Sequence, residues 1–205
     1  YKRLDNILSE KKSWKTSPLR DIVDPSRKIT YGVVQPGPNL ERGGVPLIRG
    51  QDYSSGTVST EGLYQIGKGI AASYARSTVE GGDLLFSIVG YVGNVAQVPE
   101  VLTGANITQT TARIAVRDGF DARYIFHYLK SERFREEVVK YTKGSAQPGL
   151  NLSDVEKMLV HYPDYEKQCE IAVILDEMSL NLNAQRKILS NLELIEFGLR
   201  EDLFL

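Results

Sequence analysis

The 205-residue sequence has one cysteine, Cys169, and only two histidines, His127 and His161. One cysteine permits no internal disulfide, which favours a reducing cytoplasm. These three side chains do not suffice for a zinc site of the usual type, so we predict no metal in this chain. No apolar run approaches the roughly 18 residues that span a bilayer, and residues 1–5 (YKRLD) begin no apolar signal-peptide core. We expect a cytoplasmic protein without membrane contact, and the absence of an initiator Met indicates a processed or excised start.

Catalytic motifs are lacking as well. The chain contains neither a phosphate-binding P-loop nor the Gly-x-Ser-x-Gly turn of hydrolases. It has no Asn/Asp-Pro-Pro-aromatic stretch of the kind found in adenine methyltransferases. The segments GKG (67–69) and GYVG (90–93) are too short to be dinucleotide fingerprints. The sequence therefore predicts a non-catalytic protein with no cofactor of its own.

Composition is that of a globular protein, with 41% hydrophobic and 25% charged residues. The net charge of −1 conceals an uneven distribution. Residues 1–150 carry 20 Lys and Arg against 15 Asp and Glu, whereas residues 151–205 carry 5 against 11. A basic body followed by an acidic segment indicates parts with different partners, and the basic part suits phosphates.

The fold class predicted is α+β, with a β-rich domain over residues 1–163. Short β-branched runs broken by Gly, Pro and Asn predict strands in 29–58, 81–99 and 107–116. Helical signals flank them: a short helix at 17–23, and one stripe of apolar residues from Asp121, which can cap it, to Gly144, which can end it. Ser153 and Glu156 have the spacing of a capping box that would begin another short helix.

Residues 164–205 form a second predicted unit, a long helix capped by Asp164 and free of Gly and Pro until Gly198. Its seam residues alternate at spacings of three and four, which is a heptad register. They are Leu175, Met178, Leu182, Gln185, Leu189, Leu192, Glu196, Leu199 and Leu203. The helix either packs on its own domain or forms an antiparallel coiled coil. Its length and its polar seam positions favour the coiled coil.

Polar and aromatic side chains gather on Gly-rich turns. Such side chains pair with base edges in DNA, while basic groups and Gly amides hold phosphates. The alternative interpretation is that they are ordinary turn residues. The candidate DNA contacts are Arg49, Gln51, Tyr91, Asn106, Gln109, Thr110, Lys143, Ser145 and Gln147.

Three segments carry a resemblance to a known family. They are ITYGVVQPGP…GVPLIRGQDYSSGTV from residue 29, GGDLLFSIVGYVGNV from residue 81, and GSAQPGLNLSDVEKMLVHYPDYEKQCEIAVILDEM from residue 144. The chain resembles, over essentially its whole length, a type I restriction-modification specificity subunit (HsdS). The closing motif is the most specific part: a Gly-Ser-x-Gln-x-x-Leu loop, a short helix, a strand to Pro, and then Glu166-x-Gln168-x-x-Ile171.

The resemblance implies a target recognition domain that reads one half of a split site in double-stranded DNA. It also implies a helix that acts as spacer and docks methyltransferase and restriction subunits, which would bring S-adenosylmethionine, ATP and Mg. Family members usually carry two recognition domains and two helices. This chain has material for one of each, so we expect a half-subunit, a truncation product or an excised half, paired through its helix with a second copy or second half.

Two alternatives stay open at this point. The chain could be the recognition segment of a fused restriction-methyltransferase, which shares the DNA-reading role. It could instead be a β-rich adaptor with a dimerising helix that binds protein or glycan.

Overall fold

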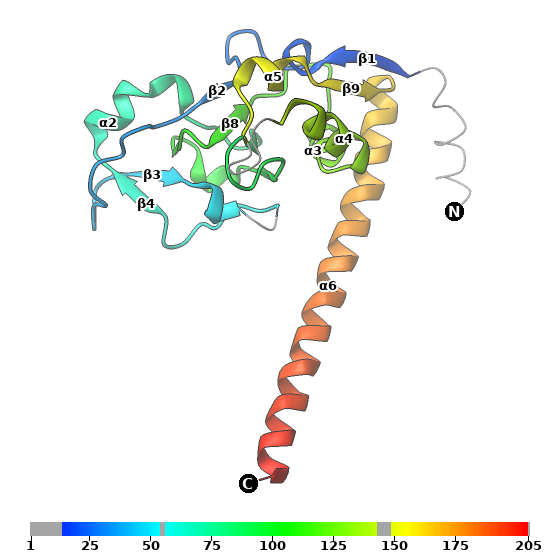
Figure 1. Ribbon diagram of the computed structural model, residues 1–205. Coiled ribbons are helices and arrows are strands. Elements are labelled where there is room, and N and C mark those ends of the chain that lie inside the picture. The colour runs from blue at the N-terminus through cyan, green and yellow to red at the C-terminus, as the bar shows by residue number, and fades with distance from the viewer. Residues whose placement is uncertain (1–13, 54–55, 143–148, 205) are drawn as a thin grey trace.

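The structure, a computed structural model, describes residues 14–53, 56–142 and 149–204 (Figure 1). A β-rich body lies at one end, and a 40-residue helix, α6 (Tyr165–Phe204), projects away from it (Figure 1). The expected α+β class is confirmed. None of the helices in the described ranges is both long and apolar enough to cross a membrane.

Within the described residues, three small sheets build the body. The largest is antiparallel, in the order β2 (Thr30–Tyr31), β8 (Thr111–Ile114), β5 (Leu84–Ser87), β6 (Val95–Gln97). The second has the order β4 (Tyr64–Ile66), β3 (Val45–Ile48), β7 (Asn106–Ile107), with β3 and β7 parallel. The third pairs β1 (Lys15–Pro18) with β9 (Leu159–Tyr162), two strands that are far apart in sequence.

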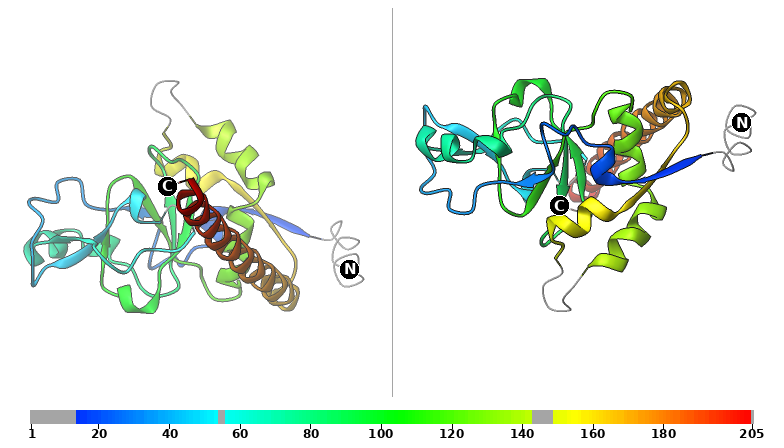
Figure 2. Two further views of the ribbon diagram at one scale, coloured as in Figure 1. Left: turned by 90° about the horizontal axis from the view of Figure 1, so that it is seen from below. Right: turned by 90° about the horizontal axis from the view of Figure 1, so that it is seen from above.

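Short helices complete the body. They are η2 (Leu19–Asp21), η3 (Gly50–Tyr53), α2 (Lys68–Ser73), η4 (Ala75–Ser77), η5 (Glu100–Leu102), α3 (Ala122–Leu129), α4 (Glu132–Tyr141) and α5 (Leu152–Lys157). Both views in Figure 2 place α3, α4 and α5 toward the half of the body from which α6 leaves, with β3, β4 and α2 at the opposite end. The helix expected at 17–23 is confined to the single 3-10 turn η2, which follows directly on β1.

Strand β5 is buried on both faces because it separates two apolar clusters. Leu84 and Phe86 belong to the cluster that includes α3 and α4, whereas Leu85 belongs to the cluster on the other face with Tyr53 and Ala96. All four strand residues are buried. Such a strand reads as a continuous apolar run rather than an alternating one.

The helix predicted from Asp121 to Gly144 is in fact two helices. Asp121 caps the first, as expected, and accepts hydrogen bonds from the amides of Arg123 (2.8 Å) and Tyr124 (3.4 Å). The chain then breaks at Ser131, whose Oγ accepts from the Phe134 amide and begins α4. The break lets the buried Phe134 ring enter the core, 5.9 Å from the Phe86 ring between centroids.

The capping box predicted at Ser153 and Glu156 is wrong. Asn151 is the cap of α5, and its side-chain oxygen accepts from the Asp154 amide at 2.9 Å. Ser153 lies inside the helix and donates its hydroxyl to the Asn151 oxygen. Asn is among the preferred N-cap residues, and starting the helix two residues earlier also lets Leu152 pack against the core.

Only the first turns of α6 are packed against the body. Asp164 caps the helix, as predicted, by accepting from the Lys167 amide at 3.0 Å. Gln168, Ile171 and Ala172 are buried against α3 and its surroundings. From Leu180 to Arg200 every described side chain is exposed. Along this stretch, therefore, the helix does not pack on its own domain.

Candidate nucleic-acid interface

Several of the polar turns named from the sequence meet at one edge of the sheets. The Thr108 amide donates to the carbonyl of Ile48, where β3 ends (3.2 Å), and the Ile88 amide donates to the carbonyl of Thr110 (2.9 Å). The Leu150 amide in turn donates to the Ile88 carbonyl (2.9 Å). Segments 48–53, 87–91, 108–111 and 149–150, which are distant in sequence, therefore adjoin. We call this the turn edge.

The turn that follows β3 is held in place by a buried hydrogen bond to β8. The buried hydroxyls of Tyr53 and Thr111 lie 2.8 Å apart and share a hydrogen bond, which fixes η3 to β8. A methyl group placed on Gly50 would lie 3.9 Å from the Thr110 hydroxyl and 4.0 Å from that of Ser87. The turn backbone thus sits directly on its neighbours, while the Gln51 side chain stays exposed.

Arg49 is held in a fixed orientation. Its Nε and Nη2 donate to the two carboxylate oxygens of Asp52 at 3.1 and 3.0 Å, and its guanidinium lies 5.5 Å from the centre of the Tyr64 ring. Asp52 also accepts from the Arg49 amide. The hydrogen bonds to Asp52 raise the pKa of Arg49 further, so the group stays charged. An oriented guanidinium is suited to contact either a phosphate or a guanine edge.

The remaining candidates divide into three groups. Tyr91 is 66% exposed and Gln109 is exposed, whereas Thr110 is half-buried beside the Thr108 hydroxyl. Asn106 is only 1% exposed: its amide oxygen accepts from Ser77 and its amide nitrogen donates to the Ala71 carbonyl. Its assignment to the DNA-contacting set does not fit this placement, and we remove it. Lys143, Ser145 and Gln147, together with the predicted helix end Gly144, lie outside the described residues.

Two basic residues that the sequence did not single out lie beside the turn edge. Lys130 and Arg135 line a hollow of about 570 Å³ together with residues 90 and 92–94 of the turn after β5. The Lys130 ammonium lies 4.7 Å from the centre of the Phe126 ring, and its pKa is lowered by burial and by the positive charge of Arg186. The only sequence signal for this pair was the general basic balance, because Lys130 is the C-cap of α3 and Arg135 lies within α4 rather than on a Gly-rich turn.

No group of three or more possible metal-ligating side chains occurs within the part of the chain that the structure describes.

The seam residues of α6 show a consistent pattern. Leu175 is half-buried at the body, whereas Met178, Leu182, Leu189, Leu192 and Leu199 are 48–57% exposed. Gln185 and Glu196 are exposed as well, and the Leu203 side chain lies outside the described part.

The structure is thus a β-rich domain with clustered polar turns, carried at one end of a long helix. The sequence family of type I restriction modification DNA specificity domains matches residues 11–194. The chain belongs to this family, as the resemblance indicated.

Relatives agree with this assignment. The chain is 32% identical over 179 residues to the specificity subunit of the type I restriction enzyme EcoBI of Escherichia coli, covering 87% of this chain and 37% of that protein. It is 28% identical over 116 residues to the MjaIX specificity subunit of Methanocaldococcus jannaschii, covering 55% of this chain and 26% of that protein. The chain thus spans well under half the length of these relatives.

Solved structures show the same fold. A chain from a study of complex assembly and conformational transition in the type I R-M system superposes with a TM-score of 0.63 at 19% identity, covering 85% of this chain and 40% of that one. The HsdS subunit from Thermoanaerobacter tengcongensis superposes with a TM-score of 0.55 at 17% identity, covering 85% and 39%.

Proposed function

We propose that the body of this protein reads one half of a bipartite site in double-stranded DNA, as a non-catalytic specificity component of a type I restriction-modification system. The observation that carries the proposal is the turn edge, where Arg49, Gln51, Gln109 and Tyr91 come together from separate parts of the sequence. Family membership supports DNA recognition over a protein- or glycan-binding adaptor.

Phosphate contact and base reading are separable by mutation. Lys130→Gln should weaken binding to all duplexes and reduce the slope of log affinity against log salt by about one, because one phosphate contact is lost. Gln51→Ala or Gln109→Ala should instead cost about 1–3 kcal/mol against the cognate base at one position. Lys15→Gln is the matched control, because β1 lies beside the root of α6 and away from the turn edge (Figure 1).

Fluorescence anisotropy with labelled duplexes at several salt concentrations measures these effects. An affinity that is independent of salt would exclude phosphate-driven binding. If Lys130→Gln and both Gln variants bind like the Lys15→Gln control, the turn edge is not the DNA surface. The same assay applies to the sequence-predicted pair, Lys143→Ala for phosphate contact and Gln147→Ala for base reading.

The projecting part of α6 pairs, in this proposal, with the same helix of a second copy in antiparallel orientation. Its exposed apolar seam is larger than a soluble monomer usually leaves in water. A two-fold dimer would place one recognition domain at each end of a spacer of about 60 Å, more than one DNA turn of about 34 Å. Two identical readers so related should select an interrupted palindrome.

Light scattering tests the dimer. The wild type should be dimeric at tens of micromolar, and Leu182→Glu with Leu189→Glu should be monomeric because charges enter the seam. Disulfide cross-linking in a Cys169→Ser background determines whether the two α6 helices pair antiparallel or parallel. Leu175→Cys with Leu199→Cys should cross-link between copies, whereas Leu175→Cys alone should not, since the two copies of residue 175 lie far apart. Cross-linking by the single variant indicates a parallel pair, and a monomeric wild type removes the dimer altogether.

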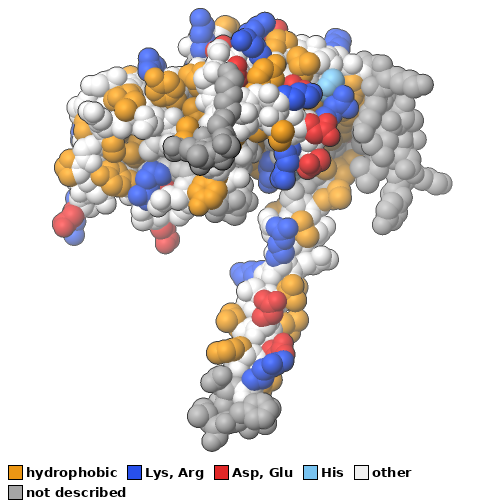
Figure 3. Space-filling view, viewed as in Figure 1, with side chains coloured by type: hydrophobic (Ala, Val, Ile, Leu, Met, Phe, Trp, Pro, Cys, Tyr) orange, Lys and Arg blue, Asp and Glu red, His pale blue; other side chains and the backbone are white. Residues whose placement is uncertain are grey.

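Methyltransferase and restriction subunits complete the proposed assembly. A second set of apolar residues lies opposite the seam, with Leu180 and Leu194 exposed by 70% and 67%. On the face of α6 visible in Figure 3, apolar side chains appear on both flanks of a charged strip. Seam pairing would leave the opposite flank free for the methyltransferase. Leu180→Glu with Leu194→Glu should therefore abolish co-purification with that subunit and keep the dimer, the reverse of what the seam variants do.

A further inference from the structure

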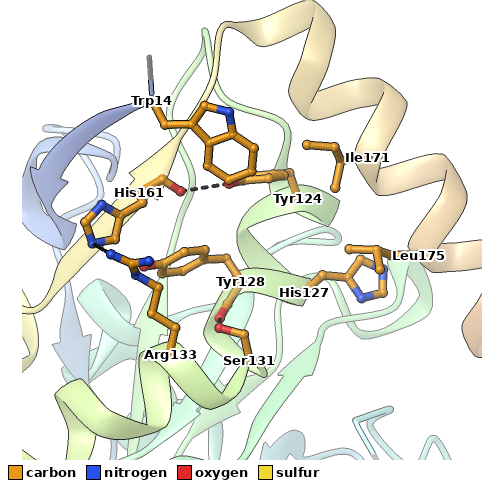
Figure 4. A pocket seen from close by; sticks show the side chains of 9 residues that line it. All are labelled: Trp14, Tyr124, His127, Tyr128, Ser131, Arg133, His161, Ile171 and Leu175. Atoms are coloured by element: carbon orange, nitrogen blue, oxygen red, sulfur yellow. Dashed lines mark hydrogen bonds between the residues drawn. The ribbon is translucent and has the colours of Figure 1, made fainter. Parts of the chain in front are cut away.

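An apolar cavity of about 340 Å³ lies where β1, β9, α3 and α6 meet (Figure 4). Its walls include Trp14, Tyr124, His127, Tyr128, Ile171 and Leu175. In Figure 4 the Trp14 ring and the Tyr124 and Tyr128 side chains face the space from one side, with Ile171 and Leu175 of α6 opposite. The recognition role proposed above makes no use of this cavity.

Most polar atoms around the cavity are already engaged. The Tyr124 hydroxyl donates to the His161 carbonyl at 2.7 Å, and the His161 ring nitrogens contact the Thr16 hydroxyl (2.7 Å) and an Arg133 Nη (3.1 Å). His127 Nε2 is held by an Asp176 carboxylate oxygen at 2.7 Å. The cavity therefore offers mainly ring faces and methyl groups, which suit an apolar occupant.

The cavity is also the upper end of the heptad seam. Ile171 and Leu175 precede Met178 and Leu182 at spacings of four, three and four, so they continue the same stripe into the body. Seam positions are of two kinds: those followed by the next seam residue at a spacing of three, and those followed at a spacing of four. In an antiparallel coiled coil, a position of one kind packs against a position of the other kind on the partner helix. The register that leaves no seam position unpaired sets Leu182 against Leu192 of the second copy and Leu175 against Leu199. Continued by one turn, it brings residue 203 of the second copy to Ile171.

We infer that the cavity receives the last turn of α6 from a second copy of this chain, with Leu203 and Phe204 entering between the aromatic rings. The inference rests on the proposed antiparallel pairing and identifies where that interface ends. Charge agrees with it, because Asp202, which flanks the seam next to Leu203, would arrive beside Arg133 at the cavity wall. The same chain cannot supply this turn, since 28 helical residues separate positions 175 and 203, a distance of about 42 Å.

Trp14 is the single tryptophan of the chain, so its fluorescence reports on the cavity alone. In the full-length protein, Leu203→Glu with Phe204→Glu should shift the emission to longer wavelength and increase quenching by acrylamide. Leu194→Glu, which adds a charge on the opposite flank of the same helix, should leave both unchanged. Light scattering on the same samples shows whether the dimer persists through the central seam.

A mixed dimer shows whether the segment that fills the cavity comes from the partner or from the same chain. The experiment remains valid even if the double variant weakens the homodimer. A chain with Trp14 and the two Glu substitutions is combined with excess Trp14→Phe chain that is otherwise intact. Protection of Trp14 in the mixture supports insertion by the partner. If Trp14 stays as exposed as in the double variant alone although mixed dimers form, the inference is wrong.

Two further outcomes also overturn it and stay distinct from failure of the dimer. A dimeric double variant with unchanged quenching would show that the helix ends do not fill the cavity although the seam pairs. Exposure of Trp14 on deletion of residues 1–12, but not in the double variant, would make the chain's own N-terminal segment the occupant. A monomeric wild type would remove both the pairing and the insertion.

Discussion

The body and the projecting half of α6 contain the same kinds of apolar side chain, but these are buried in the body and exposed on the helix. Leu84 in β5 is fully buried, whereas Leu194 in α6 is 67% exposed. The body buries its Leu, Ile and Phe within one chain, and this burial determines the fold. The helix keeps comparable residues in water over many turns, so they contribute nothing to folding of the isolated chain and are available to partners. Apolar content alone thus does not distinguish a core from an exposed helix face.

A matched pair of truncations gives the largest expected effect. Leu84→Ala should lower the free energy of unfolding by about 2–5 kcal/mol, because it removes buried methyl groups and leaves a cavity. Leu194→Ala should change it by less than about 0.5 kcal/mol, since its side chain is exposed. Urea unfolding followed by Trp14 fluorescence measures both at one protein concentration. Equal losses would mean that Leu194 is buried in the isolated protein and that the contrast between body and helix is false.

Gln168 links α6 to the body, and its substitution should have the next largest effect on stability. Its side-chain oxygen accepts from the Asp121 amide at 3.1 Å, and its nitrogen donates to the Pro163 carbonyl at 3.0 Å. Gln168→Ala leaves both buried backbone groups unsatisfied and should cost about 1–3 kcal/mol. Asn183→Ala, exposed on the same helix and outside the seam, is the control. A loss below that of the control would show that α6 is not fixed to the body through this residue.

The sequence predicted α6 well and the internal contacts of the body poorly. Asp164, a Gly-free and Pro-free stretch and the heptad spacing are local signals, and the helix follows them. The break between α3 and α4 was missed although Ser131 is a standard cap residue, because the apolar stripe continues across it. A helix begins at whichever of several possible cap residues allows the side chains that follow it to pack in the core. That packing depends on the rest of the fold.

The cap of α5 tests this last point directly. Asn151→Ala should destabilise the body by about 1 kcal/mol, because the Asp154 amide loses its acceptor. Ser153→Ala should have a smaller effect, since Ser153 lies within the helix and only contacts the Asn151 oxygen. Thermal unfolding of the two variants compares them. The opposite order would restore the capping box that the sequence predicted.

The sequence could indicate candidate site residues but not which of them lie together. Polar residues on Gly-rich turns were singled out as a group, and their meeting at one edge depends on the parallel pairing of β3 with β7 and on the bridge between Val89 and Gly149. Asn106 resembles its neighbours in sequence but is turned inward by Ser77 and Ala71, which come from a segment 29 or more residues away. Long-range contacts of this kind leave no local signal.

The smallest expected effect is a pH dependence that belongs to the body alone. The chain has two histidines, both in the body, and α6 has none. Burial, followed by the positive charge of Arg133, holds the pKa of His161 below its ordinary value of 6.5, while Glu137 opposes the shift. The unfolded chain therefore binds a proton at this site more readily than the folded one. Its contribution to stability is complete above about pH 6.5 and declines as the pH falls through that value.

Unfolding curves between pH 7.5 and 5 on the wild type, His161→Gln and His127→Gln isolate this contribution. The wild type should lose stability slightly toward pH 5, and His161→Gln should lose less of it than His127→Gln. Asp121 and Glu137, whose pKa values are lowered, give up their contributions only below their ordinary values of 3.8 and 4.5, outside this window. A pH dependence that survives in His161→Gln would assign it to another group. Because the central seam of α6 contains no histidine, pairing through that seam, measured by light scattering, should persist across the same range.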